Sequence, residues 1–322
     1  MIKKRKGLLA VSIVMVSLFL QTQFLFGKEL SKIFLEEVLS VGSLDDDALF
    51  QWVGVVTDLK NYIYVTDAMD YSLKKFDTKG NLLKKTGRKG QGPGEFLAPR
   101  LLDSSDQLLY VTDQYIPGIH VFDRNLEFRR KIPLMRLVGD LKVISDKQIA
   151  VVTLSYGQIG KIFFYDDKGK VIREFDYSTK KSSLLMDSIS FDIDFHGNIY
   201  LAYNFQDKIE KFDAEGRKLW SQELLRIGRV KRKKISSMVV PFKIVYKDVV
   251  LDTAGKLFVL GGNLSKNPSR DVYVLSQKGE HLTTFTLPET SHCIYIDSQD
   301  YLYSRANDGV TLKKYRMRII YK

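Results

Sequence analysis

Carboxylates at a recurring position are the side chains of this sequence with the clearest capacity for chemistry. An aspartate stands a few residues before a Tyr or Phe in five places, at Asp58, Asp103, Asp194, Asp252 and Asp297. Carboxylates gathered around a central axis would suit a divalent metal ion. Asp before Gly or Asn is also ordinary turn chemistry, because its carboxylate accepts a hydrogen bond from the backbone two residues further on. We interpret the five aspartates as turn residues and predict no metal site.

Histidine and cysteine give no second chemical pattern. His120, His196, His281 and His292 lie in different repeats at unrelated offsets, without the spacing of metal ligands. Cys293 is the only cysteine, which excludes an internal disulfide and favours a buried structural thiol. No G-x-S-x-G segment or other nucleophile arrangement is present. The sequence therefore predicts no catalytic residue and no cofactor.

A glycine-rich loop, GRKGQGPGEFLAP at residues 87–99, contains Arg88, Lys89 and Gln91 among alternating glycines. Phosphate-binding loops have G-x-G-x-x-G or G-x-x-x-x-G-K-[ST] before a helix, and neither spacing occurs here. The segment leads into a strand instead. We interpret the loop as a structural turn between repeats, whose three polar side chains are candidates for contact with a partner.

Basic residues give the strongest signal for a partner. The formal net charge is +12, and it stays at +8 without the four basic residues of the N-terminal segment. Part of the excess lies in one long connection, at Arg226, Arg229, Lys231, Arg232, Lys233 and Lys234. A basic run often means only a solvated loop. As a binding surface it would attract a protein or an acidic envelope polymer, whereas nucleic acid does not suit an exported protein.

A repeated unit must position these candidates. Residues 61–96 have the pattern of strand, turn, strand, turn and strand, followed by the glycine-rich loop, and Tyr64 marks the first of these strands. Equivalent positions recur with steps of 40 to 58 residues, at Tyr110, Ala150, Tyr200, Phe258 and Tyr303. Several short strands in a period of about 40–50 residues indicate propeller blades. Turn glycines with positive φ are expected at Gly80, Gly169, Gly216 and Gly279.

The last repeat is incomplete, and the N-terminal part of the chain can complete it. After Tyr303 only 19 residues remain, so the sixth unit lacks its outer strand. Residues 33–41, IFLEEVLSV, form an isolated strand-like run that can join the last blade and remove its unpaired edge. The sequence predicts an all-β six-bladed β-propeller over residues 28–322, with four-stranded antiparallel blades and a ring closed by this strand.

Units such as NYIYVTDAMDYSLKKFDTKGNLLKKTG and GNIYLAYNFQDKIEKFDAEGRKL resemble NHL-type repeats of six-bladed β-propellers, over nearly all of residues 30–322. The loop GRKGQGPGEFLAP is similar to one frequent in a bacterial group of exported six-bladed propellers of mostly unassigned function. Some six-bladed relatives are lactonases or lyases that hold a divalent metal in the central channel. The resemblance implies the fold, and it implies an enzyme only by analogy.

The first residues have the pattern of a secretory signal. Four basic residues, 3–6, precede the apolar run Leu8–Leu20. We expect export to the periplasm or the extracellular space, with a signal peptide at residues 1–27 that is cleaved near Gly27. The alternative is an uncleaved inner-membrane anchor, with the apolar run continuing through Phe26.

These observations predict an exported binding propeller without chemistry of its own, which engages a ligand or protein partner through loops on one face. We expect that face to carry the connections between blades and the loops after the second strands. It collects the glycine-rich loop, the basic run and the long loops at 155–160 and 261–270. The alternatives are a metal-dependent hydrolase or lyase, which alone would need a divalent metal, and a passive envelope scaffold.

Overall fold

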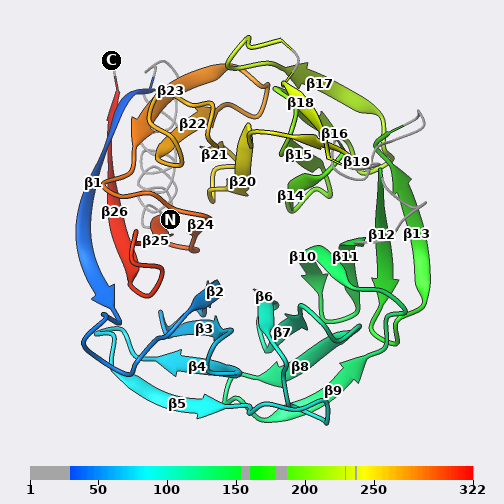
Figure 1. Ribbon diagram of the computed structural model, residues 1–322, viewed down its shortest axis with the longest axis vertical. Helices are drawn as coiled ribbons and strands as arrows, with labels where there is room; N and C mark the ends of the chain where they lie inside the picture. The colour runs from blue at the N-terminus through cyan, green and yellow to red at the C-terminus, as the bar shows by residue number, and fades with distance from the viewer. Residues whose placement is uncertain (1–29, 154–159, 179–186, 229, 236–237, 322) are drawn as a thin grey trace, which may run out of the picture.

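Short runs of β-branched and aromatic residues form the strands of this protein. The structure, a computed structural model, describes residues 30–153, 160–178, 187–228, 230–235 and 238–321. The described residues form six four-stranded antiparallel sheets, arranged as the blades of a closed ring (Figure 1), and one two-stranded sheet. The predicted all-β six-bladed propeller is confirmed. No helix in these ranges is long and apolar enough to cross a membrane.

The first three blades place their four strands in chain order from the central channel to the rim. Blade 1 contains β2 (Trp52–Thr57), β3 (Ile63–Asp67), β4 (Ser72–Phe76) and β5 (Leu82–Thr86). Blade 2 contains β6 (Pro99–Ser104), β7 (Leu108–Asp113), β8 (Ile119–Asp123) and β9 (Phe128–Ile132). Blade 3 contains β10 (Val138–Ser145), β11 (Gln148–Thr153), β12 (Lys161–Asp166) and β13 (Val171–Asp176).

The other three blades follow the same order, except that the last one takes its outer strand from the N-terminal segment. Blade 4 contains β14 (Ile189–Ile193), β15 (Ile199–Tyr203), β16 (Ile209–Phe212) and β17 (Lys218–Gln222). Blade 5 contains β20 (Tyr246–Leu251), β21 (Leu257–Gly261), β22 (Asp271–Leu275) and β23 (His281–Thr286). Blade 6 contains β24 (Ile294–Ile296), β25 (Tyr301–Arg305), β26 (Leu312–Tyr321) and β1 (Leu30–Val41). The two-stranded sheet, β18 (Arg232–Ile235) and β19 (Met238–Pro241), lies between blades 4 and 5.

An Asp and a Tyr six residues apart build the first turn of several blades. Asp58 Oδ1 accepts hydrogen bonds from the backbone N–H of Lys60 and Tyr62, and Asp58 Oδ2 accepts one from the Tyr64 hydroxyl at 2.9 Å. This bond satisfies the hydroxyl of a fully buried tyrosine. The same Asp–Tyr bond joins Asp194 to Tyr200 and Asp297 to Tyr303.

The second kind of turn joins the two outer strands of a blade. The predicted glycines have left-handed backbone, with φ of 86° at Gly80, 83° at Gly169, 88° at Gly216 and 84° at Gly279. In blade 2 Leu126 takes the equivalent place with φ of 61°. The glycine prediction is confirmed, because this turn needs a conformation that L-residues rarely adopt.

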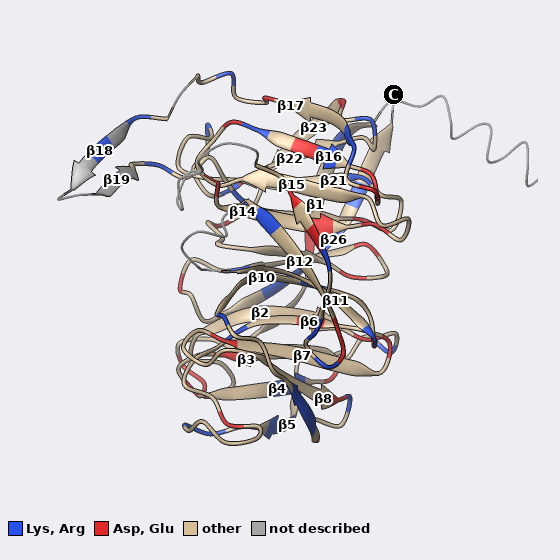
Figure 2. Ribbon diagram, turned by 90° about the vertical axis from the view of Figure 1, so that its right-hand side faces the viewer, with Lys and Arg blue, Asp and Glu red and all other residues tan. Residues whose placement is uncertain are grey.

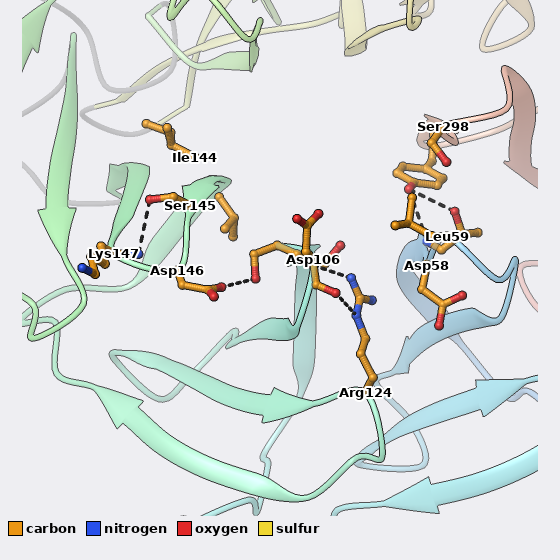
Figure 3. Close-up of a pocket in the computed structure, with 14 residues that line it drawn as sticks. Asp58, Leu59, Asp106, Arg124, Ile144, Ser145, Asp146, Lys147 and Ser298 are labelled. Atoms are coloured by element: carbon orange, nitrogen blue, oxygen red, sulfur yellow. Dashed lines mark hydrogen bonds between the residues drawn. The ribbon is translucent and has the colours of Figure 1, made fainter.

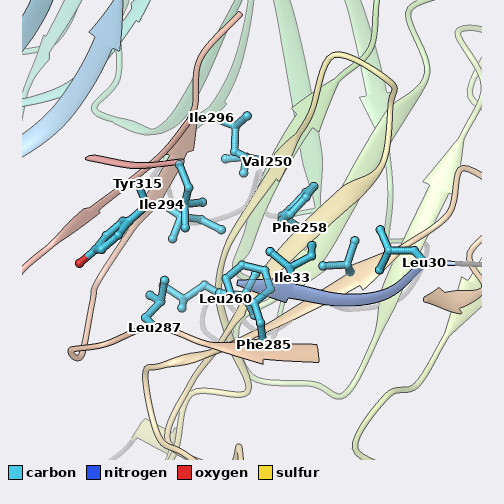
Figure 4. Packing of buried hydrophobic residues seen from close by; sticks show 13 residues of the cluster. Leu30, Ile33, Val250, Phe258, Leu260, Phe285, Leu287, Ile294, Ile296 and Tyr315 are labelled. Atoms are coloured by element: carbon cyan, nitrogen blue, oxygen red, sulfur yellow. The ribbon is translucent and has the colours of Figure 1, made fainter. Parts of the chain in front are cut away.

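Apolar side chains fill the spaces between neighbouring blades. One such cluster joins blade 5 to blade 6 and contains Leu30 and Ile33 of β1 together with Phe258, Phe285 and Ile294 (Figure 4). The outer strand β1 is therefore part of the inter-blade core as well as an edge strand.

β1 closes the ring as predicted, although it starts at Leu30 rather than at Ile33. It pairs antiparallel with β26, from Leu30 opposite Tyr321 to Val41 opposite Leu312. The exposed ion pair of Glu36 and Arg318 also crosses this seam at 2.7 Å, but such surface pairs contribute at most about 1 kcal/mol. Backbone pairing and apolar burial hold the closure.

We predict that the apolar face of β1 carries its contribution to stability. Ile33→Ala should lower the free energy of unfolding by about 2–4 kcal/mol, because Ile33 is only 7% exposed and packs between blades. The control is Phe34→Ala in the same strand, where the side chain is 51% exposed and the loss should stay near ~0.5 kcal/mol. Urea denaturation measures both. A chain that begins at Leu44 and melts at the wild-type temperature would refute the closing role of β1.

Candidate functional site

The ring has two ends that differ in their loops. Because the strands of each blade alternate in direction, the connections between blades and the loops after the second strands leave at one end, called here the connection face. The turns after the first and third strands leave at the other end, called here the turn face. A central channel lies between the innermost strands β2, β6, β10, β14, β20 and β24 (Figure 1).

Four aspartates of the innermost strands line this channel: Asp103, Asp140, Asp192 and Asp248. In each of them, Oδ1 accepts a hydrogen bond of 2.8–2.9 Å from the N–H of the next residue. Oδ2 accepts a bond of 2.7–3.0 Å from the innermost strand of the following blade. The four channel aspartates therefore join blade 2 to 3, 3 to 4, 4 to 5 and 5 to 6.

Other groups make the remaining two inter-blade contacts around the channel. Between blades 6 and 1, the Tyr295 hydroxyl accepts a hydrogen bond of 3.2 Å from the Thr57 N–H. Between blades 1 and 2, Gly54 allows direct backbone approach, since a Cβ there would lie 2.8 Å from the Leu102 nitrogen. The channel wall is thus held together by polar contacts at five junctions between blades and by close packing at Gly54 at the sixth.

Lys142 is the cation among the four channel aspartates. Its Nζ lies 3.4 Å from Asp192 Oδ1. Burial by itself lowers the pKa of Lys142, but the surrounding carboxylates, Asp192 and Asp103 foremost, outweigh burial and raise it. Burial raises the pKa of Asp103 and of Asp140 to about 6. The ammonium stays charged, and the two carboxyls titrate near neutrality.

In the described residues, the channel carboxylates are not grouped in the way that metal ligands are. In the residues that the structure describes, no group of three or more His, Cys, Asp or Glu side chains is arranged to hold a metal ion. The turn interpretation is confirmed for Asp58, Asp194, Asp252 and Asp297, whose oxygens accept turn N–H bonds. It is wrong for Asp103, which lies one strand position earlier and points at the neighbouring blade.

The mouth of the channel at the turn face contains two cavities of about 600 Å³ each. In the first one, Arg124 donates to the backbone carbonyls of Ser105 and Asp106, and the Ser105 hydroxyl donates to Asp146 (Figure 3). These charged groups therefore hold the turns of blades 2 and 3. The second cavity leads to Lys142 and Asp192.

The mouth at the connection face is lined by basic residues. A cavity of about 350 Å³ contains Arg100, Lys247, His292 and Arg305 in its wall, with Asp140 and Asp248. Of the four histidines, His292 is the one that lines this cavity. Sequence reasoning missed Arg100, Lys247 and Arg305, because they are far apart in the chain and belong to no motif.

The remaining histidines and the cysteine have structural surroundings. His120 is buried with its ring 5.3 Å from that of Phe96, and burial lowers its pKa to about 4. His196 and His281 are exposed. Cys293 is half-buried rather than fully buried, and desolvation raises the pKa of its thiol to about 12. None of these groups has the setting of a nucleophile.

The glycine-rich loop is closed by its own side chains. Arg88 donates from Nε to Glu95 Oε1 at 2.7 Å, and Glu95 Oε2 accepts the Gly92 N–H at 2.9 Å. The Lys89 ammonium lies 5.5 Å from the centre of the Tyr71 ring. Gln91 is exposed. The loop is a turn between blades 1 and 2, as expected, and the charge of Arg88 is paired within it.

The last part of the basic run, from Arg232, lies in a hairpin rather than in a loop. β18 and β19 pair antiparallel, from Arg232 opposite Pro241 to Ile235 opposite Met238, and project away from the ring (Figure 2). We call residues 231–243 the basic arm. Arg226 and Lys231 are exposed beside it, and Arg229 lies outside the described residues. The arm joins blades 4 and 5, whereas the glycine-rich loop joins blades 1 and 2, so the predicted binding residues form two separate patches.

Comparison with known proteins agrees with this architecture. A protein-family model described as a 6-bladed beta-propeller matches residues 32–209, more than half of the chain. The chain belongs to this family. A search of curated proteins finds no significant match.

Solved structures show the same fold at low identity. A virginiamycin B lyase from Staphylococcus aureus is similar with a TM-score of 0.56 and 10% identity, over 88% of this chain and 99% of that one. A streptogramin B lyase is similar with a TM-score of 0.56 and 11% identity, over 89% of this chain and 98% of that one. At these identities the similarity shows the fold alone.

We predict a stability change with pH that comes from the channel carboxyls. Asp140 titrates at about 6 in the folded protein and at 3.8 as a free side chain. The folded state therefore binds more protons between these values, and the stability that Asp140 contributes is lost as the pH rises from about 4 to 6. Asp140→Asn should give a flatter dependence of the unfolding free energy on pH over this range.

A surface aspartate provides the control for this measurement. Asp77 accepts hydrogen bonds from Asn81, which lower its pKa, so Asp77→Asn should change the pH dependence only below 3.8. Urea denaturation at several pH values measures the three proteins. Curves for wild type and Asp140→Asn that run parallel between pH 4 and 6 would contradict the assignment.

Proposed function

We propose that this protein is an exported binding propeller without chemistry of its own, and that it engages a protein partner with an acidic surface through the basic arm. The observation that carries the proposal is the projecting hairpin β18–β19 (Figure 2). Long loops on a rigid scaffold are where binding residues concentrate, and this is a loop extended into a sheet beyond the ring.

The charge of the arm supports an acidic partner. The segment from Arg226 to Lys243 contains seven basic residues and no acidic one. Lys231 and Lys233 are exposed, and neither has a salt bridge within the described residues. A concentrated positive field raises the local concentration of an acidic partner and speeds its association.

The arm also offers apolar surface and strand edges, which favour a protein over an acidic polymer. Phe242 is 60% exposed. A cavity of about 510 Å³ beside it is lined by Ile227, Val230, Phe242 and Leu264, with Lys231 and Lys243. In the described residues, β18 and β19 pair only with each other, so their outer edges are open to strand addition. An acidic polymer would bind through the basic side chains alone and would contact neither the apolar cavity nor the strand edges.

An enzyme has less support from the site. The hydrolase or lyase alternative rests on similarity of fold. It would need carboxylates that are free to bind a metal ion or a substrate, and both oxygens of each channel aspartate already accept backbone N–H bonds. A passive scaffold would not need a projecting arm with exposed lysines such as Lys231 and Lys233. The charge and the open edges of the arm therefore favour binding.

Charge reversal tests the proposal. A variant with Lys231, Arg232, Lys233 and Lys234 changed to Glu should fold normally, because the arm lies outside the blades, and should lose the partner recovered by wild type from an envelope extract. The wild-type interaction should weaken as salt rises from 0.05 to 0.5 M, since exposed charges are screened over about 10 Å at 0.1 M. Quantitative pull-down and the melting temperature measure both effects.

A matched control variant shows whether a loss of binding comes from the position of the changed residues or from the change in net charge. Changing Lys60, Lys79, Lys168 and Lys278 to Glu places the same charge change in exposed turns at the turn face and should leave recovery intact. Recovery equal in wild type and the arm variant would refute the arm as the site. Recovery that survives protease treatment of the extract would identify an acidic polymer instead of a protein.

Export is part of this proposal and has its own test. Residues 1–29 lie outside the described residues, so its support is the basic start and the apolar run of the sequence. We predict that N-terminal sequencing of the exported protein begins near residue 28. Protein that begins at Met1 and stays in the membrane fraction would indicate an anchor.

A further inference from the structure

The cavity where the channel opens at the connection face brings together basic groups that are distant in the sequence. Lys247 comes from β20, Arg305 from the end of β25, Arg100 from β6, and His292 from the residues just before β24. Lys247 Nζ lies 3.4 Å from His292 Nδ1. Three blades therefore direct cationic side chains toward one space at the axis of the ring.

These groups repel one another and have no acidic partner. Within the described part of the chain, Lys247, Arg305 and Arg100 form no salt bridge. Burial lowers the pKa of Lys247, and the nearby Arg305 lowers it further. Burial, Lys247 and Arg305 also lower the pKa of His292. An arrangement of like charges without a counter-charge costs free energy.

The two carboxylates in the same wall form no salt bridge with Lys247, Arg305 or Arg100 in the described residues, and these three cations outnumber them. Asp248 accepts the N–H groups of Val249 and Ile294, and Asp140 accepts those of Leu141 and Phe191. The charge of Lys142 acts on both carboxylates and partly offsets the rise in pKa that burial causes. The mouth of the channel thus keeps a positive charge that its own walls leave unbalanced.

The hydrogen-bonding groups are also incompletely used. Arg305 donates from Nη1 to the Trp52 carbonyl at 2.9 Å, which fixes the guanidinium, but its buried Nε has no partner in the described structure. Lys247 donates to the Ser291 carbonyl at 3.1 Å, contacts His292 Nδ1 at 3.4 Å, and retains a further N–H group. A fixed guanidinium beside an ammonium is the arrangement that binds an oxyanion.

We propose that this cavity binds a small anion through a carboxylate or phosphate group, held between Lys247 and Arg305. Its volume of about 350 Å³ is at the small end of the range for small-molecule sites and excludes a macromolecule. Arg100 and His292 line the same space and provide further donors. The site is separate from the basic arm and does not depend on the proposed partner.

Lys247→Met tests the proposal because it should weaken anion binding without lowering the melting temperature of the protein. Without added anion, the variant should melt at or above the wild-type temperature, since a repelled cation is removed. In titrations with inorganic phosphate and with acetate, it should bind about tenfold or more weakly than wild type, because a charge-assisted hydrogen bond is lost. The stronger of the two probes identifies the anion as a phosphate or a carboxylate.

Calorimetric titration and melting curves in phosphate, acetate and chloride at equal ionic strength provide the readout. Arg100→Gln should also weaken binding, and Lys266→Met, an exposed lysine on the same face, should not. Stabilisation of wild type that follows ionic strength alone would overturn the proposal. A lower melting temperature of Lys247→Met without anion would show that Lys247 is retained for its bond to Ser291, and would overturn it as well.

Discussion

The pairing of β1 with β26 is the constraint on which the rest of this structure depends. Each blade is a separate sheet, and no strand ladder joins one blade to the next in the described residues. A ring of six such sheets stays closed only when the first and last blades are joined. The outer strand of blade 6 comes from the N-terminal segment, so both ends of the described chain are fixed in one sheet. The distances across the channel follow from that closure.

Aspartate shows how position in the blade decides the role of a residue type. At the ends of first and third strands, an Asp accepts N–H bonds within its own turn, as Asp58 and Asp77 do. Inside an innermost strand, the same side chain reaches the next blade, as in Asp103 and Asp140. Local chemistry is the same in both settings, since a carboxylate satisfies backbone donors. Only the second role needs a neighbouring blade at the right distance.

The charges of the molecule are distributed so that the two ends of the channel differ. Turn aspartates line the mouth at the turn face, where Arg124 is bound to backbone carbonyls. Lys247 and Arg305 line the mouth at the connection face without acidic partners in the described residues, and the basic arm projects near the connection between blades 4 and 5. The connection face therefore carries basic residues at two separate places, the mouth of the channel and the basic arm, and our two binding proposals rest on these.

The sequence by itself determined the number of blades, the turn glycines, four of the five turn aspartates and the strand that closes the ring. These features depend on contacts within about 20 residues or on a count of strands, which spacing reveals. Only the tertiary structure decided that Asp103 joins two blades, that Lys142 lies among four carboxylates, and that Lys247 and Arg305 share a cavity. Such contacts join different blades at the axis, and the distance between two residues there follows from the radius of the closed ring and not from their separation in the chain.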